Sequence, residues 1–171
     1  MEMEKADLIY KGLSAYSSPI IIVKKKPDLT TGKSSLRMCV DYRKLNASIP
    51  KDLKDEKGNF IAPFPLPQIE VLLSTMKDKP YRSMLDCRGG FHHILLTKEA
   101  QEKSAFTALS TRYLWKRLPF GIHLGPSYFS YALSRVLHGI DGVLFYIDDI
   151  LILSRTLEEH LAMLRRVCTR G

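Results

Sequence analysis

Residues 143–153 read VLFYIDDILIL, two apolar runs on either side of the adjacent carboxylates Asp148 and Asp149. Short runs rich in Val, Ile, Leu, Phe and Tyr predict buried strands. A two-residue interruption between such runs predicts a tight hairpin, and Asp tolerates the backbone angles that a turn needs. The stretch therefore predicts a hairpin with both carboxylates at its tip and its two arms in the core.

This pair of carboxylates has two interpretations. Asp is a favoured turn residue, so the pair fits an ordinary turn. Two adjacent anions on an apolar hairpin also repel each other, and any loss of hydration raises that cost. A bound divalent cation would remove the cost. The second interpretation is therefore a metal site.

The segments around the hairpin predict an alternation of helices and strands. Before it, residues 124–138 have an apolar face at helical spacing, and Pro126 falls in the opening turn, where Pro is tolerated. After it, residues 157–167 predict an amphipathic helix. Residues 81–86, YRSMLD, predict a strand that ends on Asp86.

The remaining segments give the same mixture. We expect short helices at residues 4–11 and 67–76, and strands at 20–23, 36–42, 104–108 and 112–116. Residues 50–67 predict an exposed loop rich in Pro and charge. Because helical and strand patterns alternate without segregating, we expect the fold class to be α+β or mixed α/β.

Two sets of side chains in these segments have open interpretations. Residues 20–42 predict a hairpin whose tip carries Lys24, Lys25 and Lys26. These lysines fit either a solvated loop or contacts to phosphate, since Arg37 is close by. His92 and His93 fit surface or packing roles better than a metal site, because Cys87 completes no recognised ligand spacing.

Composition narrows the class of protein. The chain has 171 residues, 45% hydrophobic and 26% charged, which is typical of a globular domain. A net charge of +8 points towards a polyanionic partner. Three widely spaced cysteines fit neither a disulfide framework nor a zinc knuckle and favour a reducing compartment. No apolar run approaches the about 18 residues of a membrane span, and the acidic N-terminus does not resemble a signal peptide.

The acidic residues together suggest a reaction. A strand that ends on Asp86 and a hairpin with Asp148 and Asp149 can hold two divalent ions about 3.5–4 Å apart, as in phosphoryl transfer. Mg²⁺ suits such a site because it accepts a few carboxylates and completes its shell with water and phosphates. Nearby lysines and an arginine can then hold a triphosphate.

At this point the chain resembles the reverse transcriptase domain of LTR retrotransposons and retroviruses, closest to gypsy-like elements and their Pol polyproteins. The resemblance runs from about residue 18 to residue 167, in the order of the family. The matching segments are SPIIIVKKK, LRMCVDYRKLN, PFPLPQIEVLL, LDCRGGFHHILL, KSAFTALSTRYLWKRLPFGIHLGPSYF, YIDDILILS and EEHLAMLRRV. It implies the fingers and palm of a right-hand polymerase, with a mixed or antiparallel palm sheet and packed helices.

The resemblance also implies roles for single residues. The metal-binding aspartates are Asp86 and Asp148, and Asp149 is the third acid of the active site. The cofactor is Mg²⁺ or Mn²⁺. Contacts to the incoming deoxynucleotide are assigned to Lys25, Arg37, Phe91 and Phe120, with Phe91 blocking a ribose 2′-OH. Tyr146 contacts the primer or template, and Asp41 and Arg43 match a paired motif.

The sequence departs from the family at several places. Residues 46–67 are longer than the usual link, and Leu124 replaces an expected polar residue. The resemblance stops where a thumb would begin, so we expect a thumbless fragment of a longer polyprotein or a decayed element. We expect residues 1–17 to be a lead-in and residues 18–171 the fingers and palm domain.

These observations lead to one main function and three alternatives. The main function is an RNA-directed DNA polymerase core that acts on an RNA or DNA template with a primer and on dNTPs. We expect no membrane partner. We expect the remaining Pol domains as partners in the full polyprotein. The alternatives are an inactive remnant that binds nucleic acid, an interaction protein that has reused the palm, and a DNA-templated polymerase. We expect an intracellular, cytoplasmic location in a reverse-transcribing particle with access to the nucleus.

Overall fold

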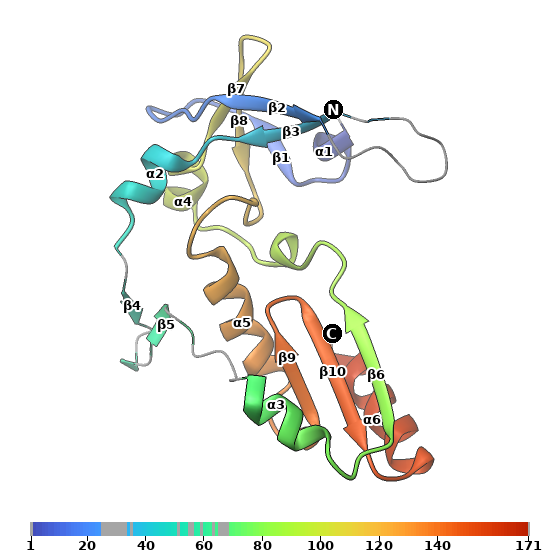
Figure 1. Ribbon diagram of the computed structural model, residues 1–171. Coiled ribbons are helices and arrows are strands. Elements are labelled where there is room, and N and C mark those ends of the chain that lie inside the picture. Colours follow the sequence, from blue (N-terminus) through green and yellow to red (C-terminus); the bar gives the residue numbers. More distant parts are fainter. Residues whose placement is uncertain are drawn as a thin grey trace. The chain divides into compact units, whose positions relative to one another are not determined.

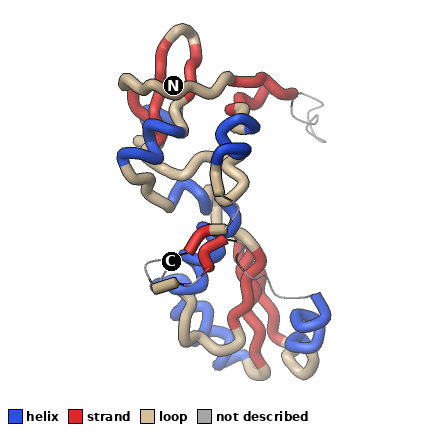
Figure 2. The backbone as a smooth tube through the Cα atoms, turned by 90° about the vertical axis from the view of Figure 1, so that its left-hand side faces the viewer, coloured by secondary structure: helices blue, strands red, loops and turns tan. Residues whose placement is uncertain are grey.

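The computed structural model describes residues 2–24, 34, 36–50, 52–54, 57–58, 60–62, 64 and 69–170. Helices and strands alternate along the chain, in agreement with the α+β prediction (Figure 1). The chain divides into two compact units, of which unit 1 comprises residues 1–50 and 91–125 and unit 2 comprises residues 51–90 and 126–171. Both units contain helices and strands (Figure 2).

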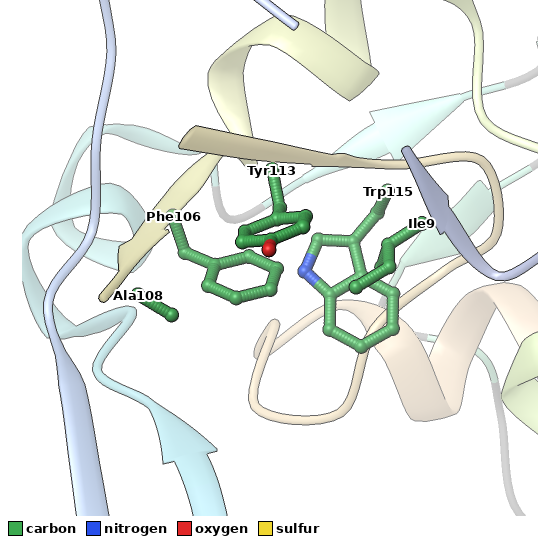
Figure 3. Close-up of a cluster of buried hydrophobic side chains, with 5 residues drawn as sticks. All are labelled: Ile9, Phe106, Ala108, Tyr113 and Trp115. Carbon is green, nitrogen blue, oxygen red and sulfur yellow. The ribbon is translucent and has the colours of Figure 1, made fainter. Parts of the chain in front are cut away.

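Unit 1 is built on a three-stranded antiparallel sheet. Its strands are β1 (Ile9–Lys11), β8 (Thr111–Trp115) and β7 (Phe106–Ala108), in the order β1-β8-β7. The register places Ile9 opposite Trp115 and Phe106 opposite Tyr113. These four residues and Ala108 form a buried cluster in which the rings of Phe106, Tyr113 and Trp115 pack together (Figure 3).

The short helix predicted for residues 4–11 is wrong in its second half. Helix α1 covers only Glu2–Lys5, and Asp7 then takes a φ of 56°, outside the helical region. Ile9 continues as part of β1 and is 1% exposed in the cluster. Burial against Trp115 therefore overrode a local helical pattern.

The second sheet of unit 1 is the hairpin predicted for residues 20–42. Strands β2 (Ile20–Lys24) and β3 (Leu36–Val40) pair antiparallel from Ile20–Val40 to Lys24–Leu36. Ser18, just before β2, bonds through its backbone to Ala105 and Thr107, which attaches the hairpin to β7. The unit also contains α2 (Arg43–Ser48), α4 (Lys98–Lys103) and most of the 3₁₀ turn η1 (Gly90–His93).

Unit 2 is built on the sheet that carries the two-aspartate stretch. Its strands are β6 (Tyr81–Asp86), β10 (Asp149–Ser154) and β9 (Val143–Tyr146), in the antiparallel order β6-β10-β9. The predicted hairpin and the predicted strand at 81–86 are thereby confirmed as structure. Helix α6 (Leu157–Arg170) packs against β10 and β6 (Figure 1).

The other elements of unit 2 are α3 (Ile69–Met76), α5 (Gly125–Val136), which begins at the end of unit 1, and the two-stranded β4 (Leu53–Lys54) and β5 (Phe60–Ala62). Helix α5 confirms the helix predicted for residues 124–138, and it buries Phe129 and Leu133. The ring of Phe64 contacts the rings of Tyr131 and Phe145. Within the described part of the chain, no helix is long and apolar enough to span a bilayer.

A buried histidine fixes α6 to the sheet. His160 is 6% exposed, and its ring nitrogens lie 2.7 Å from the Ser83 hydroxyl and 2.9 Å from the Ser154 hydroxyl. Because Ser154 donates its own proton to the Thr156 carbonyl, its oxygen accepts from His160 Nδ1, and Ser83 donates to Nε2. Every polar atom of this small network is therefore satisfied.

Candidate active site

The acidic end of the β6-β10-β9 sheet brings three of the predicted residues together. Asp149 is the first residue of β10, and it pairs with Asp86 on one side and with Tyr146 on the other. Residues that face each other across antiparallel strands have Cβ atoms about 5 Å apart. Asp86, Asp149 and Tyr146 therefore lie in one row at the end of the sheet.

The position predicted for Asp149 is wrong. The pairing of Tyr146 with Asp149 closes a two-residue turn made of Ile147 and Asp148, so only Asp148 lies at the tip. Ile147 has a φ of 57°, a left-handed conformation that is rare for a β-branched residue. The sequence pattern favoured Asp over Ile for the turn, and the strand register shifted the turn by one residue.

A backbone hydrogen bond ties this turn to the loop after β6. The Cys87 amide donates to the Asp148 carbonyl over 2.9 Å. Burial raises the pKa of the Cys87 thiol, and the charges of Asp86, Asp148 and Asp149 raise it further. The thiol thus lies among the three carboxylates.

The carboxylates are suited to a cation. All three are exposed, and within the described residues no basic side chain forms an ion pair with any of them. Like charges across neighbouring strands destabilise a sheet, and a divalent ion would remove that repulsion.

The described residues contain no group of three or more His, Cys, Asp or Glu side chains arranged to hold a metal by themselves. Carboxylates are the donors that Mg²⁺ takes, one or two at a time, while water and substrate phosphates complete its shell.

Unit 1 holds the residues predicted to contact a nucleotide. Arg37 and Phe120 line a hollow of about 200 Å³ between β3 and the bend at residues 118–121; its other lining residues are Met3, Met38, Cys39, Val40, His92, Trp115 and Gly121. Phe91 does not line the hollow but contacts the Phe120 ring, with 5.0 Å between the ring centroids. Lys25 lies outside the described residues.

His92 is a residue that the sequence did not single out for this hollow. Its ring meets the edge of Phe120 at 5.1 Å and stacks on Trp115 at 5.9 Å. Its Nε2 is buried and has no hydrogen-bond partner, and burial lowers the pKa of the imidazole, which favours the neutral form. His92 therefore packs as an aromatic ring beside Phe120, in agreement with the packing role favoured over a metal role.

Asn46 is the second residue that sequence reasoning missed. Its side-chain amide donates to the Gly121 carbonyl over 2.8 Å, and its Oδ1 accepts from the His123 amide over 2.9 Å. Gly121 has a φ of 96°, and a Cβ there would meet the Tyr42 ring at 3.4 Å. Gly121 thus allows the backbone conformation of the bend that carries Phe120, and the hydrogen bonds of Asn46 attach this bend to α2. An Asn after Leu45 gives no such signal in sequence, because its partners lie more than 70 residues away.

Asp41 and Arg43, which match the paired motif of the family, form an ion pair. The Arg43 guanidinium donates to both Asp41 carboxylate oxygens, with the shortest contact at 2.7 Å. These bonds lower the pKa of Asp41 to about 2. Asp41 directly follows β3, the strand with Arg37, and Arg43 begins α2, the helix with Asn46.

Comparison with known proteins identifies the family of this chain. A profile of the family described as reverse transcriptase (RNA-dependent DNA polymerase) matches residues 23–171. The chain therefore belongs to the reverse transcriptase family. It resembles in particular the retrovirus-related Pol polyproteins of gypsy-like transposons.

Similar sequences come from plant viruses and insect transposons. A putative enzymatic polyprotein of Cassava vein mosaic virus is 38% identical over 146 residues, which are 85% of this chain and 21% of the relative. The Pol polyprotein from transposon 297 of Drosophila melanogaster is 33% identical over 171 residues, 99% of this chain and 15% of the relative. The chain thus spans about a fifth or less of these relatives.

Similar solved structures come from foamy virus. The protease-reverse transcriptase in complex with RNA/DNA hybrid has a TM-score of 0.79 and 27% identity, over 98% of this chain and 20% of that one. The form in complex with ds DNA has a TM-score of 0.74 and 30% identity, over 98% and 26%. The predicted fold, an α+β fingers and palm fragment, is thereby confirmed.

Proposed function

We propose that this chain is the catalytic core of an RNA-directed DNA polymerase that extends a primer 3′-OH with dNTPs. The observation that supports it best is the row of Asp86, Asp149 and Tyr146 beside the Asp148 turn, in a chain of the reverse transcriptase family. The primer hydroxyl attacks the α-phosphate of the dNTP, and pyrophosphate leaves. The activity would belong to a longer protein, of which this chain corresponds to one part.

In this proposal Asp86 and Asp148 would hold two Mg²⁺ or Mn²⁺ ions, with Asp149 as the neighbouring acid. When bound, such ions would lower the pKa of the attacking hydroxyl and balance the charge that develops on the phosphate. The protein side chains orient the reactants: the carboxylates fix where cations gather, and Tyr146, 46% exposed next to Asp149, offers a ring to the primer or template. Steering of the polyanionic substrates is supported by the net charge of +8.

The hollow in unit 1 supports a role in holding the incoming dNTP. Arg37 can donate to a triphosphate, as Arg does to phosphate elsewhere, and Lys25 is assigned the same task. Phe120 is 47% exposed and rests on Phe91 and His92, which gives it a fixed position beside a base or sugar. We assign to Phe91 the exclusion of a ribose 2′-OH.

Primer extension on an RNA template with dNTPs and Mg²⁺ or Mn²⁺ tests the proposal, with Asp148→Asn as the variant and Asp141→Asn as a matched control on an exposed loop. Extension by the wild type and the control, but not by Asp148→Asn, is the expected result. Equal extension by all three would mean that a contaminating enzyme does the synthesis. A DNA template in parallel separates an RNA-directed from a DNA-directed enzyme.

A second function, nucleic-acid binding without catalysis, is supported by the basic net charge alone. It predicts binding that weakens steeply with salt and no extension by any form of the chain. We place residues 18–171 in the polymerase domain and residues 1–17 in a lead-in. An intracellular site of action is supported by the three free cysteines.

A further inference from the structure

Helix α6 carries a second apolar line besides the one that it buries. Its buried residues, His160 and Val167, belong to the side that packs on the sheet. The second line consists of Leu157, Leu161, Leu164 and Cys168, and we call it the outer stripe. Its spacing of four, three and four residues keeps these side chains in one row along the helix.

The outer stripe is accessible. Leu157 is 53% exposed and Leu161 is 48% exposed, Leu164 is half-buried, and Cys168 is exposed. Residues at this spacing are the ones that an amphipathic helix uses to bind a partner helix or groove.

The charges beside the stripe indicate which partner fits. Glu158 and Arg165 are both exposed and lie seven residues, or two helical turns, apart, so they flank the stripe on the same side. Among the described residues neither side chain forms an ion pair. One end of this flank is therefore acidic and the other basic.

The other charged side chains within α6 itself are already engaged. The Glu159 carboxylate accepts from the Thr156 amide and, with the Thr156 hydroxyl, caps the start of α6. Arg166 donates to the Gly139 carbonyl and Arg170 to the His138 carbonyl, beyond the end of α5. Glu158 and Arg165 are thus the pair left for an outside partner.

We propose that the outer stripe binds the outer stripe of a second copy of this chain, with the two α6 helices antiparallel about a two-fold axis. The axis passes midway between Leu161 and Leu164. Each Leu161 then faces Leu164 of the second copy, and each Leu157 faces its Cys168. The two-fold axis places the charged flanks of both helices on the same side of the interface. Glu158 of each copy therefore lies beside Arg165 of the other.

The antiparallel arrangement is the one that the charges select. A parallel pair would place the two charged flanks on opposite sides of the interface, so neither Glu158 nor Arg165 would meet the opposite charge of the other copy. A single helix face buries less accessible surface than the about 1,200 Å² that stable complexes bury. The dimer is therefore weak and concentration-dependent. The inference does not depend on polymerase activity.

Sedimentation velocity across a dilution series tests the pairing by charge reversal. The wild type should shift from monomer to dimer as concentration rises, and Arg165→Glu or Glu158→Arg alone should each weaken association about tenfold. The double variant Glu158→Arg with Arg165→Glu should restore it, because each charge again meets its opposite. Lys98→Glu, an exposed reversal on α4, is the matched control and should associate as the wild type does.

Disulfide trapping tests the direction of the helices. Leu157→Cys should form a covalent dimer with the native Cys168 of the second copy on mild oxidation, and the further change Cys168→Ser should abolish it. The two positions of one helix are too far apart, about 16 Å, to close on themselves. A wild type that stays monomeric at every concentration, a double reversal that fails to restore association, or a Cys168–Cys168 crosslink in the wild type would each overturn the proposal.

Discussion

Asp149 lies directly across the antiparallel β6–β10 pair from Asp86, at the last step of the ladder. Five further residue pairs, from Ile150–Leu85 to Ser154–Tyr81, fix this register, and the Ser83 and Ser154 hydroxyls anchor the far end of both strands to His160. The two anions are therefore held close by the sheet and cannot relax apart without breaking its register.

We expect Asp149→Asn to stabilise the chain in the absence of divalent cations, by a few tenths of a kcal/mol, because it removes a cross-strand repulsion between exposed groups. Mg²⁺ should raise the melting temperature of the wild type more than that of the variant. Thermal unfolding with EDTA and with Mg²⁺ measures both effects.

Asp141→Asn, on the exposed loop before β9, is the control and should respond to Mg²⁺ as the wild type does. If Asp149→Asn destabilised the chain in EDTA, the carboxylate would have a favourable partner that the pairing with Asp86 does not suggest.

The turn before Asp148 gives a second prediction. Ile147 has a positive φ, and Asp148 does not, which is the pattern of a turn that favours Gly at its first central position. Ile147→Gly should stabilise the hairpin by about 1 kcal/mol by relieving the strain on a β-branched residue. Chemical denaturation measures the gain in the free energy of unfolding.

Ile147→Ala separates strain from side-chain contacts, because Ala loses the branched side chain but retains the Cβ that the left-handed region disfavours. It should give no gain. A gain from Ala equal to that from Gly would show that the side chain, and not the backbone angle, carries the cost.

The sequence predicted this hairpin well because its signal is local: apolar runs of strand length surround a short interruption. It could not predict which two residues form the turn, since that depends on the pairing of Asp149 with both Asp86 and Tyr146. The same limit applies to Ile9, whose burial against Trp115 is set by a strand more than a hundred residues later. Patterns along the chain give the type of an element, and contacts between distant segments give its exact bounds.

The candidate site shows the same difference between local sequence signals and contacts between distant segments. The three aspartates, Arg37 and Phe120 were predicted because a family motif marks each of them. Asn46 and His92 act on Phe120 only through the fold, by hydrogen bonds to its bend and by ring packing. Such supporting residues have no local signature, so the structure was needed to find them.

Asn46 gives a third prediction. Asn46→Ala removes the hydrogen bonds to the Gly121 carbonyl and to the His123 amide, and it should lower the free energy of unfolding by about 1–2 kcal/mol. If the proposed function holds, the KM for dNTP should rise more than kcat falls, because Phe120 loses its fixed position. Steady-state primer extension and denaturation measure the two effects.

Asn46→Asp tests the two hydrogen bonds of Asn46 separately. It still accepts from the His123 amide but cannot donate to the Gly121 carbonyl, so it should fall between Ala and the wild type. Ser48→Ala, two residues further along, is the control and should leave the KM unchanged, since within the described part of the chain the Ser48 hydroxyl bonds to Leu45 of its own helix. A KM unchanged in Asn46→Ala would separate the bend from nucleotide binding.

The ion pair of Asp41 and Arg43 gives a prediction about acid. Because Arg43 lowers the pKa of Asp41 from 3.8 to about 2, the folded state holds this carboxylate charged more strongly than the unfolded chain does. The pair therefore stabilises the fold fully above the unfolded pKa near 4, and the contribution is lost as the pH falls towards 2. Since Arg43 is 86% exposed, the contribution is small and should shrink further in high salt.

Asp41→Asn should thus flatten the fall of stability between pH 4 and pH 2 relative to the wild type. Urea denaturation at a series of pH values, at low and high salt, measures the slope in each protein. An unchanged slope in Asp41→Asn would mean that the pair does not persist in solution. At low salt, the geometry predicts a flatter change of stability with pH in Asp41→Asn than in the wild type. At high salt, the slopes of the two proteins should converge, because screening weakens an exposed pair in the same pH window in which protonation removes it.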